Sequence, residues 1–168
     1  FMSKTKTTVT ITVNGDVYRL GVGNAAGDIS PADTLAETLR ERLLLTGTKI
    51  SCDDGACGCC TVILNGKAVP SCTILTVECD GADIQTIEGL QNPRTGELDE
   101  VQQAFVDHSA FQCGYCTPGI IMASEALLQE NPHPDEEEIK EALAGNYCRC
   151  ISHYQVLEAV KQAAERRK

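Results

Sequence analysis

Four cysteines lie within nine residues, at Cys52, Cys57, Cys59 and Cys60, and the chain contains ten in all. Thiolates at such close spacing bind iron or zinc, or they take part in redox chemistry. The stretch "FMSKTKTTVT" at the start of the sequence contains two lysines and no apolar run that could act as a secretory signal or membrane span. We therefore expect a reducing, cytoplasmic location, where close-spaced cysteines are metal ligands more often than disulfides.

Three of these cysteines have the spacing of plant-type ferredoxins, Cys52-x4-Cys57-x2-Cys60. In that pattern a loop surrounds a 2Fe-2S cluster, and a more distant cysteine, here Cys72, completes the four ligands. The glycines of the loop would let backbone N–H groups point at the cluster sulfurs. A zinc site or a group of reduced buried thiols is the alternative, although zinc sites usually show paired short spacings.

Two further thiols fall outside this pattern. Cys59 could compete with Cys60 for the same iron, but the three-residue step from Cys57 favours Cys60. We expect Cys59 and Cys79 to be small, buried apolar side chains.

A second set of cysteines lies nearer the C-terminus, as Cys113-x2-Cys116 and Cys148-x-Cys150. Spacing alone is equally compatible with zinc and with a second 2Fe-2S cluster. Helices are expected to begin just after Cys116 and Cys150, and the positive ends of their dipoles would favour an anionic centre of either kind.

The elements around the first set indicate a mixed sheet. The alternating "TVTITV" places Val9, Ile11 and Val13 on one face of a strand, and Asn14-Gly15 predicts a tight turn into "VYRL". The stretch "TVILNGKAV" predicts a second hairpin, and "DIQTIE" a further strand.

One helix is expected between the two hairpins. Thr34 and Glu37 form a capping box, and Leu35, Leu39 and Leu43 recur at helical spacing. A glycine, Gly47, lies where the helix is expected to end.

From about Asp99 the pattern becomes helical, after the polar, Gly- and Pro-containing stretch "GLQNPRTGELD". Pro118 and Pro134 suit first helical positions, "DEEE" places acidic groups at a helix N-terminus, and Ser152 with Gln155 forms a capping box. Four helices are expected, over Asp99 to Ala110, Pro118 to Glu130, Pro134 to Ala144, and Ser152 to the terminal "ERRK". The cysteine pairs fall between the first two and the last two helices, so packing the two helical hairpins face to face would bring four thiolates together.

These patterns predict an α+β protein with two domains. Residues 1–88 form a plant-type ferredoxin-like domain, residues 89–98 a linker, and residues 99–168 a helical domain that carries the second set of cysteines.

Charge excludes some partners. The chain has 14 basic and 24 acidic residues, a net charge of −10, and its basic residues cluster only in "ERRK". We therefore expect neither nucleic acid nor an anionic membrane as a partner.

Other motifs carry no chemistry. The stretch "GVGNAAG" from Gly21 matches a dinucleotide fingerprint, but "DISPADT" follows where that fingerprint needs a helix, so an elongated hairpin loop is expected. His108, His133 and His153 form no metal-spaced pair and no nucleophilic constellation. We expect no catalytic residue in this chain.

Three motifs in order, "CDDGACGCCTVILNGKAVPSC", "FQCGYCTPG" and "NYCRC", resemble the small iron-sulfur subunit of molybdenum hydroxylases, the xanthine oxidase family. Its members include carbon monoxide dehydrogenase, quinoline oxidoreductase, aldehyde oxidoreductase and 4-hydroxybenzoyl-CoA reductase. The likeness extends from about Val9 to Val160. It implies a ferredoxin-like β-grasp domain followed by a four-helix domain, each holding one 2Fe-2S cluster, and so favours a cluster over zinc at the second set.

The resemblance also implies partners. Electrons would pass from a molybdopterin site on a large subunit, through the helical-domain cluster and then the ferredoxin-type cluster, to FAD on a medium subunit. Gln112 and Cys150 would contact the pterin, and the loop Asp53-Asp54-Gly55 would face the flavin. Substrate, direction of reaction and pairing of two such heterotrimers are left open.

Three features depart from the family pattern. "ISHY" follows the last cysteine where Thr-Gly-Tyr is usual, Cys59 replaces a small residue such as Ala, and the loop from Gly21 to Ser30 is longer. Two other functions remain at this point, a diffusible ferredoxin-type carrier and a zinc-stabilised interaction module. The helical domain favours the subunit, because a simple ferredoxin does not need it.

Overall fold

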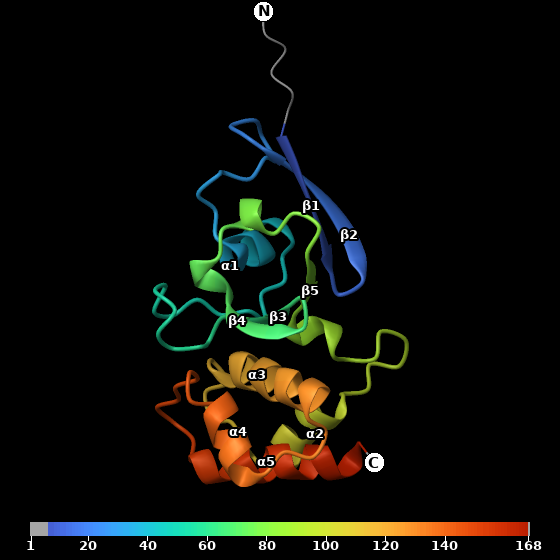
Figure 1. The fold of residues 1–168 in the computed structure, drawn as a ribbon, viewed down its shortest axis with the longest axis vertical. Helices are drawn as coiled ribbons and strands as arrows, with labels where there is room; N and C mark the ends of the chain where they lie inside the picture. The colour runs from blue at the N-terminus through green and yellow to red at the C-terminus, as the bar shows by residue number, and fades with distance from the viewer. Residues whose placement is uncertain (1–6, 168) are drawn as a thin grey trace, which may run out of the picture.

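The computed structural model describes residues 7–167, which form a five-stranded mixed sheet and a layer of helices below it (Figure 1). The strand order is β2-β1-β5-β3-β4, with β1 parallel to β5 and the other neighbours antiparallel. The predicted α+β class is therefore confirmed. The strands are β1 (Thr7–Val13), β2 (Asp16–Val22), β3 (Thr61–Leu64), β4 (Lys67–Pro70) and β5 (Asp83–Gln85).

Both predicted hairpins are present. Asn14 and Gly15 join β1 to β2, and Asn65 and Gly66 join β3 to β4; all four residues have positive φ, between 49° and 87°. Two consecutive residues with positive φ give the type I′ turn, whose twist matches that of the strands. Local turn chemistry thus sets the register of both hairpins.

The core of the sheet forms as the alternation predicts. Val9, Ile11 and Val13 are buried on one face of β1 and pack with Leu35 and Leu39 from the helical segment after the first hairpin. In β3, Val62 belongs to this same core, and the next residue, Ile63, points to the opposite face of the sheet and packs against the helical layer.

The helix after the first hairpin ends earlier than predicted. The capping box of Thr34 and Glu37 is present, but α1 (Leu35–Glu37) continues as a π-helical turn over Thr38–Arg42. Leu44 then takes a positive φ of 59°.

Gly47 is not the residue that ends this helix. A β-carbon there would lie 2.2 Å from Ile87 Cγ2, and the Gly47 N–H donates to Glu88 at 2.8 Å. The glycine therefore permits a close approach between two loops. The predicted strand "DIQTIE" is also shorter than expected, because after Gln85 the chain turns into a 3-10 helix, Ile87–Gly89.

The C-terminal half contains helices at each of the four predicted places. Capping boxes begin α2, α4 and α5, at Asp99, Asp135 and Ser152. Pro118 is the second residue of α3, whereas Pro134 precedes the cap of α4 and lies outside the helix, because Asp135 takes the capping position. The helices are α2 (Glu100–Asp107), α3 (Thr117–Glu130), α4 (Glu136–Ala142) and α5 (His153–Arg166).

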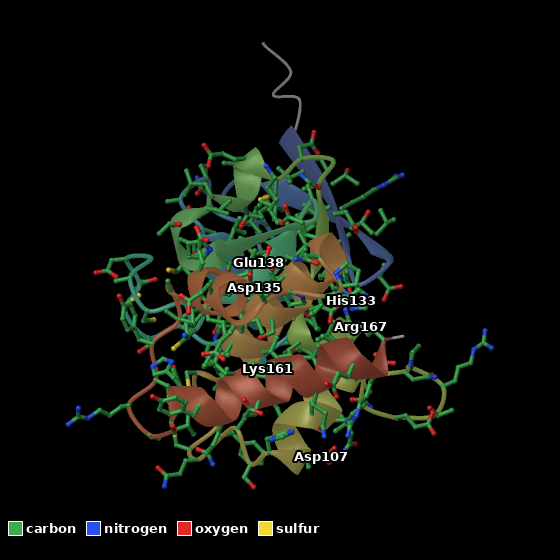
Figure 2. All side chains as sticks on the ribbon, turned by 60° about the horizontal axis from the view of Figure 1, so that its bottom comes forward. Asp107, His133, Asp135, Glu138, Lys161 and Arg167 are labelled. Carbon is green, nitrogen blue, oxygen red and sulfur yellow. The ribbon has the colours of Figure 1, made fainter. Side chains whose placement is uncertain are left out.

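Helix α3 lies between the sheet and the remaining helices (Figure 1). Its Met122 and Ala126 pack on Ile63 of β3. On the far side of the helical layer, Lys161 lies on α5 (Figure 2), and its Nζ is 2.9 Å from Glu136 of α4. No helix within residues 7–167 has the length and apolar character needed to cross a membrane.

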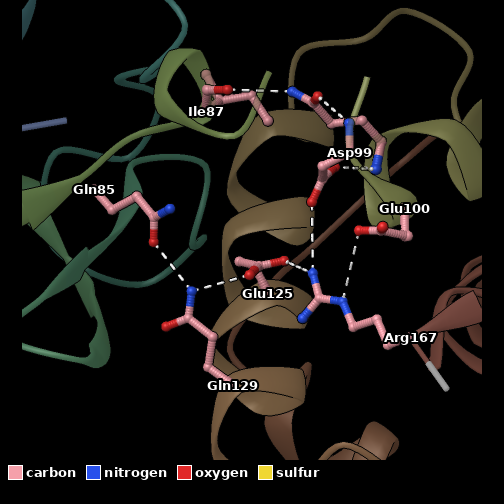
Figure 3. A network of polar contacts seen from close by, with 8 residues as sticks. Gln85, Ile87, Asp99, Glu100, Glu125, Gln129 and Arg167 are labelled. Atoms are coloured by element: carbon pink, nitrogen blue, oxygen red, sulfur yellow. Dashed lines mark hydrogen bonds and ion pairs between the residues drawn. The ribbon is translucent and has the colours of Figure 1, made fainter. Parts of the chain in front are cut away.

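Arg167, just after α5, closes the helical layer through a polar network (Figure 3). Its guanidinium bonds to the buried Glu125 of α3 and lies 3.6 Å from Asp99 at the start of α2. Gln129 donates both to Glu125, at 2.9 Å, and to Gln85 of β5, at 3.1 Å. The end of the chain is therefore connected through α3 to the sheet.

Candidate metal centres

The first set of cysteines lies on the loop before β3 and on the turn after β4. Cys60 and Cys72 are buried together, and Ser71 joins them by donating from its hydroxyl to the Cys60 carbonyl at 2.6 Å. Cys52 and Cys57 lie at the outer part of the loop, where the Cys57 N–H donates to Cys52 Sγ at 3.4 Å. The four thiols therefore form two pairs, Cys52 with Cys57 and Cys60 with Cys72.

Positive φ angles give this loop its shape. Gly55 and Gly58 have φ of 81° and 70°, a region that glycine adopts without steric cost. Asp53 also has a positive φ, of 60°, and Asp54 accepts the Ala56 N–H at 3.1 Å. Hydrogen bonds with Cys52 and with the Ala56 N–H hold the pKa of Asp54 below its usual value. Asp54 thus helps to fix the loop.

The second set comes together from the two helical connections. Cys113 and Cys116 lie between α2 and α3, and Cys148 and Cys150 lie between α4 and α5. Cys150 Sγ is 3.7 Å from Cys113 Sγ, and Cys148 hydrogen bonds with Cys116. The backbone N–H groups of Cys150 and Ile151 donate to Cys148 Sγ at 3.3 and 3.4 Å.

This arrangement fits a binuclear centre better than a single ion. Structural zinc binds four ligands that converge on one point. A 2Fe-2S cluster takes two protein ligands on each iron, which is the paired pattern found at both sets. The buried hydroxyl of Thr117, next to Cys116, also has no partner among the described atoms and could donate to a cluster sulfur.

Burial controls the ionisation of these thiols. Burial, followed by the hydrogen bonds to Cys60 and Cys148, raises the pKa of Cys72 and of Cys116 to about 12. Burial alone would also raise the pKa of Cys57. Hydrogen bonds with the Cys59 N–H and with the side chain and backbone of Cys52 instead lower this pKa to about 7. Because metal ligands are thiolates, binding of a cluster must release protons from the buried members of each set.

The two sets meet directly. The Tyr147 N–H, one residue before Cys148, donates to the Cys57 carbonyl at 3.0 Å. Beside it, Asn146 Nδ2 donates to the Gly58 carbonyl at 2.9 Å, and Gly119 of α3 packs on the same carbonyl, where a β-carbon would lie 2.1 Å away. A backbone hydrogen bond therefore connects a cysteine of one set to the neighbour of a cysteine in the other.

Sequence reasoning gave no role to these three contacts. Asn146 and Tyr147 are part of the "NYCRC" motif, but their partners lie far away in the sequence, which no local pattern reveals. Gly119 offered a signal, because a glycine inside a helix is unfavourable and often marks a close approach.

The remaining predicted site residues lie at the surface. Gln112 and Cys150 are exposed at the second set, and Asp53 and Asp54 are exposed at the first, with Gly55 half-buried. The three histidines lie on separate elements and take part in no group that could hold a metal ion within the described chain. The "GVGNAAG" segment opens no helix, because α1 begins only at Leu35.

Comparison with known proteins defines the class of these sites. Residues 25–86 match the model of the 2Fe-2S iron-sulfur cluster binding domain, and residues 86–161 match that of the [2Fe-2S] binding domain. The chain thus has two 2Fe-2S binding domains, one around each set of cysteines.

Whole-chain relatives define the family. The chain is 44% identical to the nicotine 6-hydroxylase small subunit of Paenarthrobacter nicotinovorans, over 80% of each chain. It is 40% identical, over 96% of its length and 97% of the relative, to the nicotinate dehydrogenase small FeS subunit of Eubacterium barkeri. The chain belongs to the family of small iron-sulfur subunits of molybdenum hydroxylases.

Comparison with solved structures leads to the same family. A chain of quinoline 2-oxidoreductase from Pseudomonas putida matches with a TM-score of 0.86 and 36% identity, covering 96% of this chain and 97% of that one. The aldehyde oxidoreductase of Desulfovibrio desulfuricans matches with a TM-score of 0.84 and 40% identity, but this chain covers only 17% of its length. Because several relatives are named as subunits of larger enzymes, they favour a subunit over a free-standing ferredoxin-type carrier.

Proposed function

We propose that this chain is the electron-transfer subunit of a molybdenum-containing hydroxylase or dehydrogenase. It would relay electrons between a molybdopterin site and FAD on partner subunits, and would hold no catalytic residue itself. The observation that carries the proposal is the contact between the two sets of cysteines, through the hydrogen bond from the Tyr147 N–H to the Cys57 carbonyl at 3.0 Å. Such a bond provides a short covalent and hydrogen-bonded route between two redox centres.

The proposed ligands are the two sets of four. A ferredoxin-like β-grasp domain of residues 1–88 would hold one cluster, and a four-helix domain of residues 99–168, after a linker of residues 89–98, would hold the other. Both clusters, when bound, supply one-electron redox chemistry. The ligands would be Cys52, Cys57, Cys60 and Cys72 for the ferredoxin-type site, and Cys113, Cys116, Cys148 and Cys150 for the helical site.

Residues around these sites support the role of an electron relay. Backbone N–H groups point at Cys52 and Cys148, where they would stabilise negative charge on sulfur. Asn146 and Gly119 fix the loop of the ferredoxin-type site against the helices. The distance between the two centres is therefore held by packing.

The surface of the helical site supports a large partner. Cys113 and Cys150 are exposed and line one cavity with the exposed side chains of Tyr115 and Tyr147, and exposed aromatic residues are typical of interface anchors. We propose that the molybdopterin subunit covers this surface and that Gln112 and Cys150 contact the pterin. Two more exposed aromatic side chains, Phe111 and Tyr154, lie on the segments just before Cys113 and just after Cys150 in the sequence.

We propose that the ferredoxin-type site faces a different partner, the subunit that holds FAD. Asp53 and Asp54 are exposed on its loop and Gly55 is half-buried. This loop would face the FAD of a medium subunit. In the heterotrimer, the chain would then lie between the FAD and the molybdopterin of its two partner subunits. Because close-spaced cysteines that bind a metal centre are typical of reducing compartments, we propose the cytoplasm.

The proposal is tested by isolating the tagged chain from its native source. Co-purification of two larger chains with molybdenum and flavin, together with two distinct 2Fe-2S EPR signals on reduction, is the expected result. Recovery of the chain alone, carrying only iron, would contradict the subunit role. Zinc in place of iron would contradict electron transfer altogether.

A further inference from the structure

Tyr115 lies between two proposed ligands of the helical site, Cys113 and Cys116, on the connection from α2 to α3. Gly114, just before it, has a positive φ of 82°, a conformation that glycine adopts without steric cost. The Tyr115 side chain is exposed, but its hydroxyl donates to the Ile50 carbonyl at 2.5 Å. A side chain of the helical site therefore bonds to the segment that leads into the ferredoxin-type loop.

Ile50 is part of the packing of the ferredoxin-type site. It lies two residues before Cys52, and its partly buried side chain packs against the buried pair of Cys60 and Cys72. Because protein interiors are close-packed, a shift of this side chain would be transmitted to its neighbours. The bond to the Ile50 carbonyl thus acts on the surroundings of two proposed ligands.

A second hydrogen bond holds another part of the same loop. The Tyr147 N–H, on the connection from α4 to α5, donates to the Cys57 carbonyl at 3.0 Å. Each helical connection that carries cysteines therefore supplies one hydrogen bond to the ferredoxin-type loop. Tyr115 and Tyr147 also line a cavity of about 390 Å³ with cysteines of both sets and with Cys59, which is buried as predicted.

We propose that Tyr115 is a positioning residue that fixes the separation and relative orientation of the two metal centres, through the hydrogen bond from its hydroxyl to the Ile50 carbonyl. With one bond at Ile50 and another at Cys57, the loop is held at two points and cannot pivot about one of them. The partner proposed over this surface would exclude water from the bond and so strengthen it. The inference rests on the proposed function, since it requires a metal centre at each set of cysteines.

The test compares the wild-type protein, purified with its partner subunits, with Tyr115→Phe, which removes the hydroxyl and keeps the ring. Tyr147→Phe is the matched control. Tyr147 lines the same cavity, its hydroxyl makes no hydrogen bond within residues 7–167, and its variant keeps the backbone N–H that bonds to Cys57.

Two measurements are made on each protein. EPR of the fully reduced complex gives the magnetic interaction between the two 2Fe-2S clusters, which falls steeply with their separation. The decay of each EPR signal in the presence of an iron chelator gives the rate at which each cluster is lost. A Cys52→Ser variant first identifies which signal belongs to the ferredoxin-type site.

In Tyr115→Phe we expect a weaker magnetic interaction and loss of the ferredoxin-type cluster to the chelator about fivefold faster, the factor expected for one lost hydrogen bond. Tyr147→Phe should match the wild type in both measurements. A residue that only stabilised the fold would change the rate of cluster loss but not the magnetic interaction in the intact complex.

An unchanged magnetic interaction in Tyr115→Phe, or an equal change in Tyr147→Phe, would overturn the proposal. Loss of a cluster signal in Tyr115→Phe before any chelator is added would also overturn it, because the hydroxyl would then be needed to form a site rather than to position the two sites. Absence of two 2Fe-2S signals from the wild-type complex would instead contradict the proposed function.

Discussion

The two cysteine sites offer the same number of thiols but are built differently. The ferredoxin-type site is formed by one loop and the hairpin after it, and two of its cysteines, Cys60 and Cys72, are buried. The helical site needs two separate helical connections to meet, and two of its cysteines, Cys113 and Cys150, are exposed. The first site therefore depends on local backbone conformation, and the second on the packing of helices.

This difference has a functional meaning. A site formed by local turns keeps its geometry when its surroundings change, which suits a centre that exchanges electrons across a loop. A site open on one side and held by long-range packing suits docking of a partner, which can both cover it and stabilise it. The comparison predicts that the two sites respond differently to the same perturbation.

The largest effect is expected from removing a ligand. Cys72→Ala should abolish the ferredoxin-type 2Fe-2S signal, lower bound iron by about half, and leave the helical-site signal in place. Iron analysis measures the bound iron, and EPR of the reduced protein measures the two cluster signals. Cys79→Ala, which removes a buried thiol outside the proposed ligands, is the control, and two intact signals in Cys72→Ala would show that Cys72 is not a ligand.

The second largest effect is a loss of stability that should affect the helical site more than the ferredoxin-type site. Arg167→Ala leaves the buried Glu125 without its cation and should lower the free energy of unfolding by about 3 kcal/mol. Arg166→Ala is matched in type and position, but its pair with Asp107 is more exposed, so its cost should be under about 1 kcal/mol.

Urea unfolding measures the free energy of unfolding of both variants. The EPR signal of each cluster is recorded at every urea concentration. In Arg167→Ala the helical-site signal should disappear at a lower urea concentration than the ferredoxin-type signal. Equal costs for the two arginines, or simultaneous loss of both signals, would contradict the dependence of the helical site on packing.

A smaller effect is expected where the sites meet. Alanine normally favours a helix over glycine by about 1 kcal/mol, yet Gly119→Ala should destabilise the protein by about 2 kcal/mol, because its β-carbon would overlap the Gly58 carbonyl. Gly145→Ala, whose β-carbon would meet no atom within 4 Å, is the control. The magnetic interaction between the reduced clusters should weaken only in Gly119→Ala, and an unchanged stability there would rule out a tight contact.

Much of this architecture could be predicted because its signals are local. Two Asn-Gly turns set the register of both hairpins, and the capping boxes at Thr34 and Ser152 begin helices where the sequence predicts. The spacing of Cys52, Cys57 and Cys60 is a local signal too, whereas the second set comes together only where the α2–α3 and α4–α5 connections meet.

Other features could not be read from the sequence, because they arise from tertiary contacts. The helix after Thr34 changes into a π-helical turn and ends before Gly47, which instead allows two loops to approach. The bond from Tyr147 to Cys57 and the contact of Gly119 with Gly58 join residues that are distant in the sequence. The element that connects the two sites was therefore visible only in the fold.

The smallest effect concerns pH and again distinguishes the helical half. Burial raises the pKa of Asp99, the cap of α2, to about 6, above its ordinary value of 3.8. Between these values the folded state binds more protons than the unfolded state, so the contribution of Asp99 to stability falls as pH rises from about 4 to about 6. Below that range the carboxyl is protonated in both states, and above it the full cost of its ionisation is present.

Asp99→Asn isolates this contribution, because asparagine is an equally good cap but does not titrate. Urea unfolding of both proteins between pH 4 and pH 7 should show the variant gaining stability relative to wild type as pH rises. The urea concentration at which the helical-site signal is lost should follow the same trend, while that of the ferredoxin-type signal should not. A difference between the two proteins that is constant across this range would mean that Asp99 ionises as easily in the fold as in water, and that the start of α2 is more open to solvent than the packing around Arg167 implies.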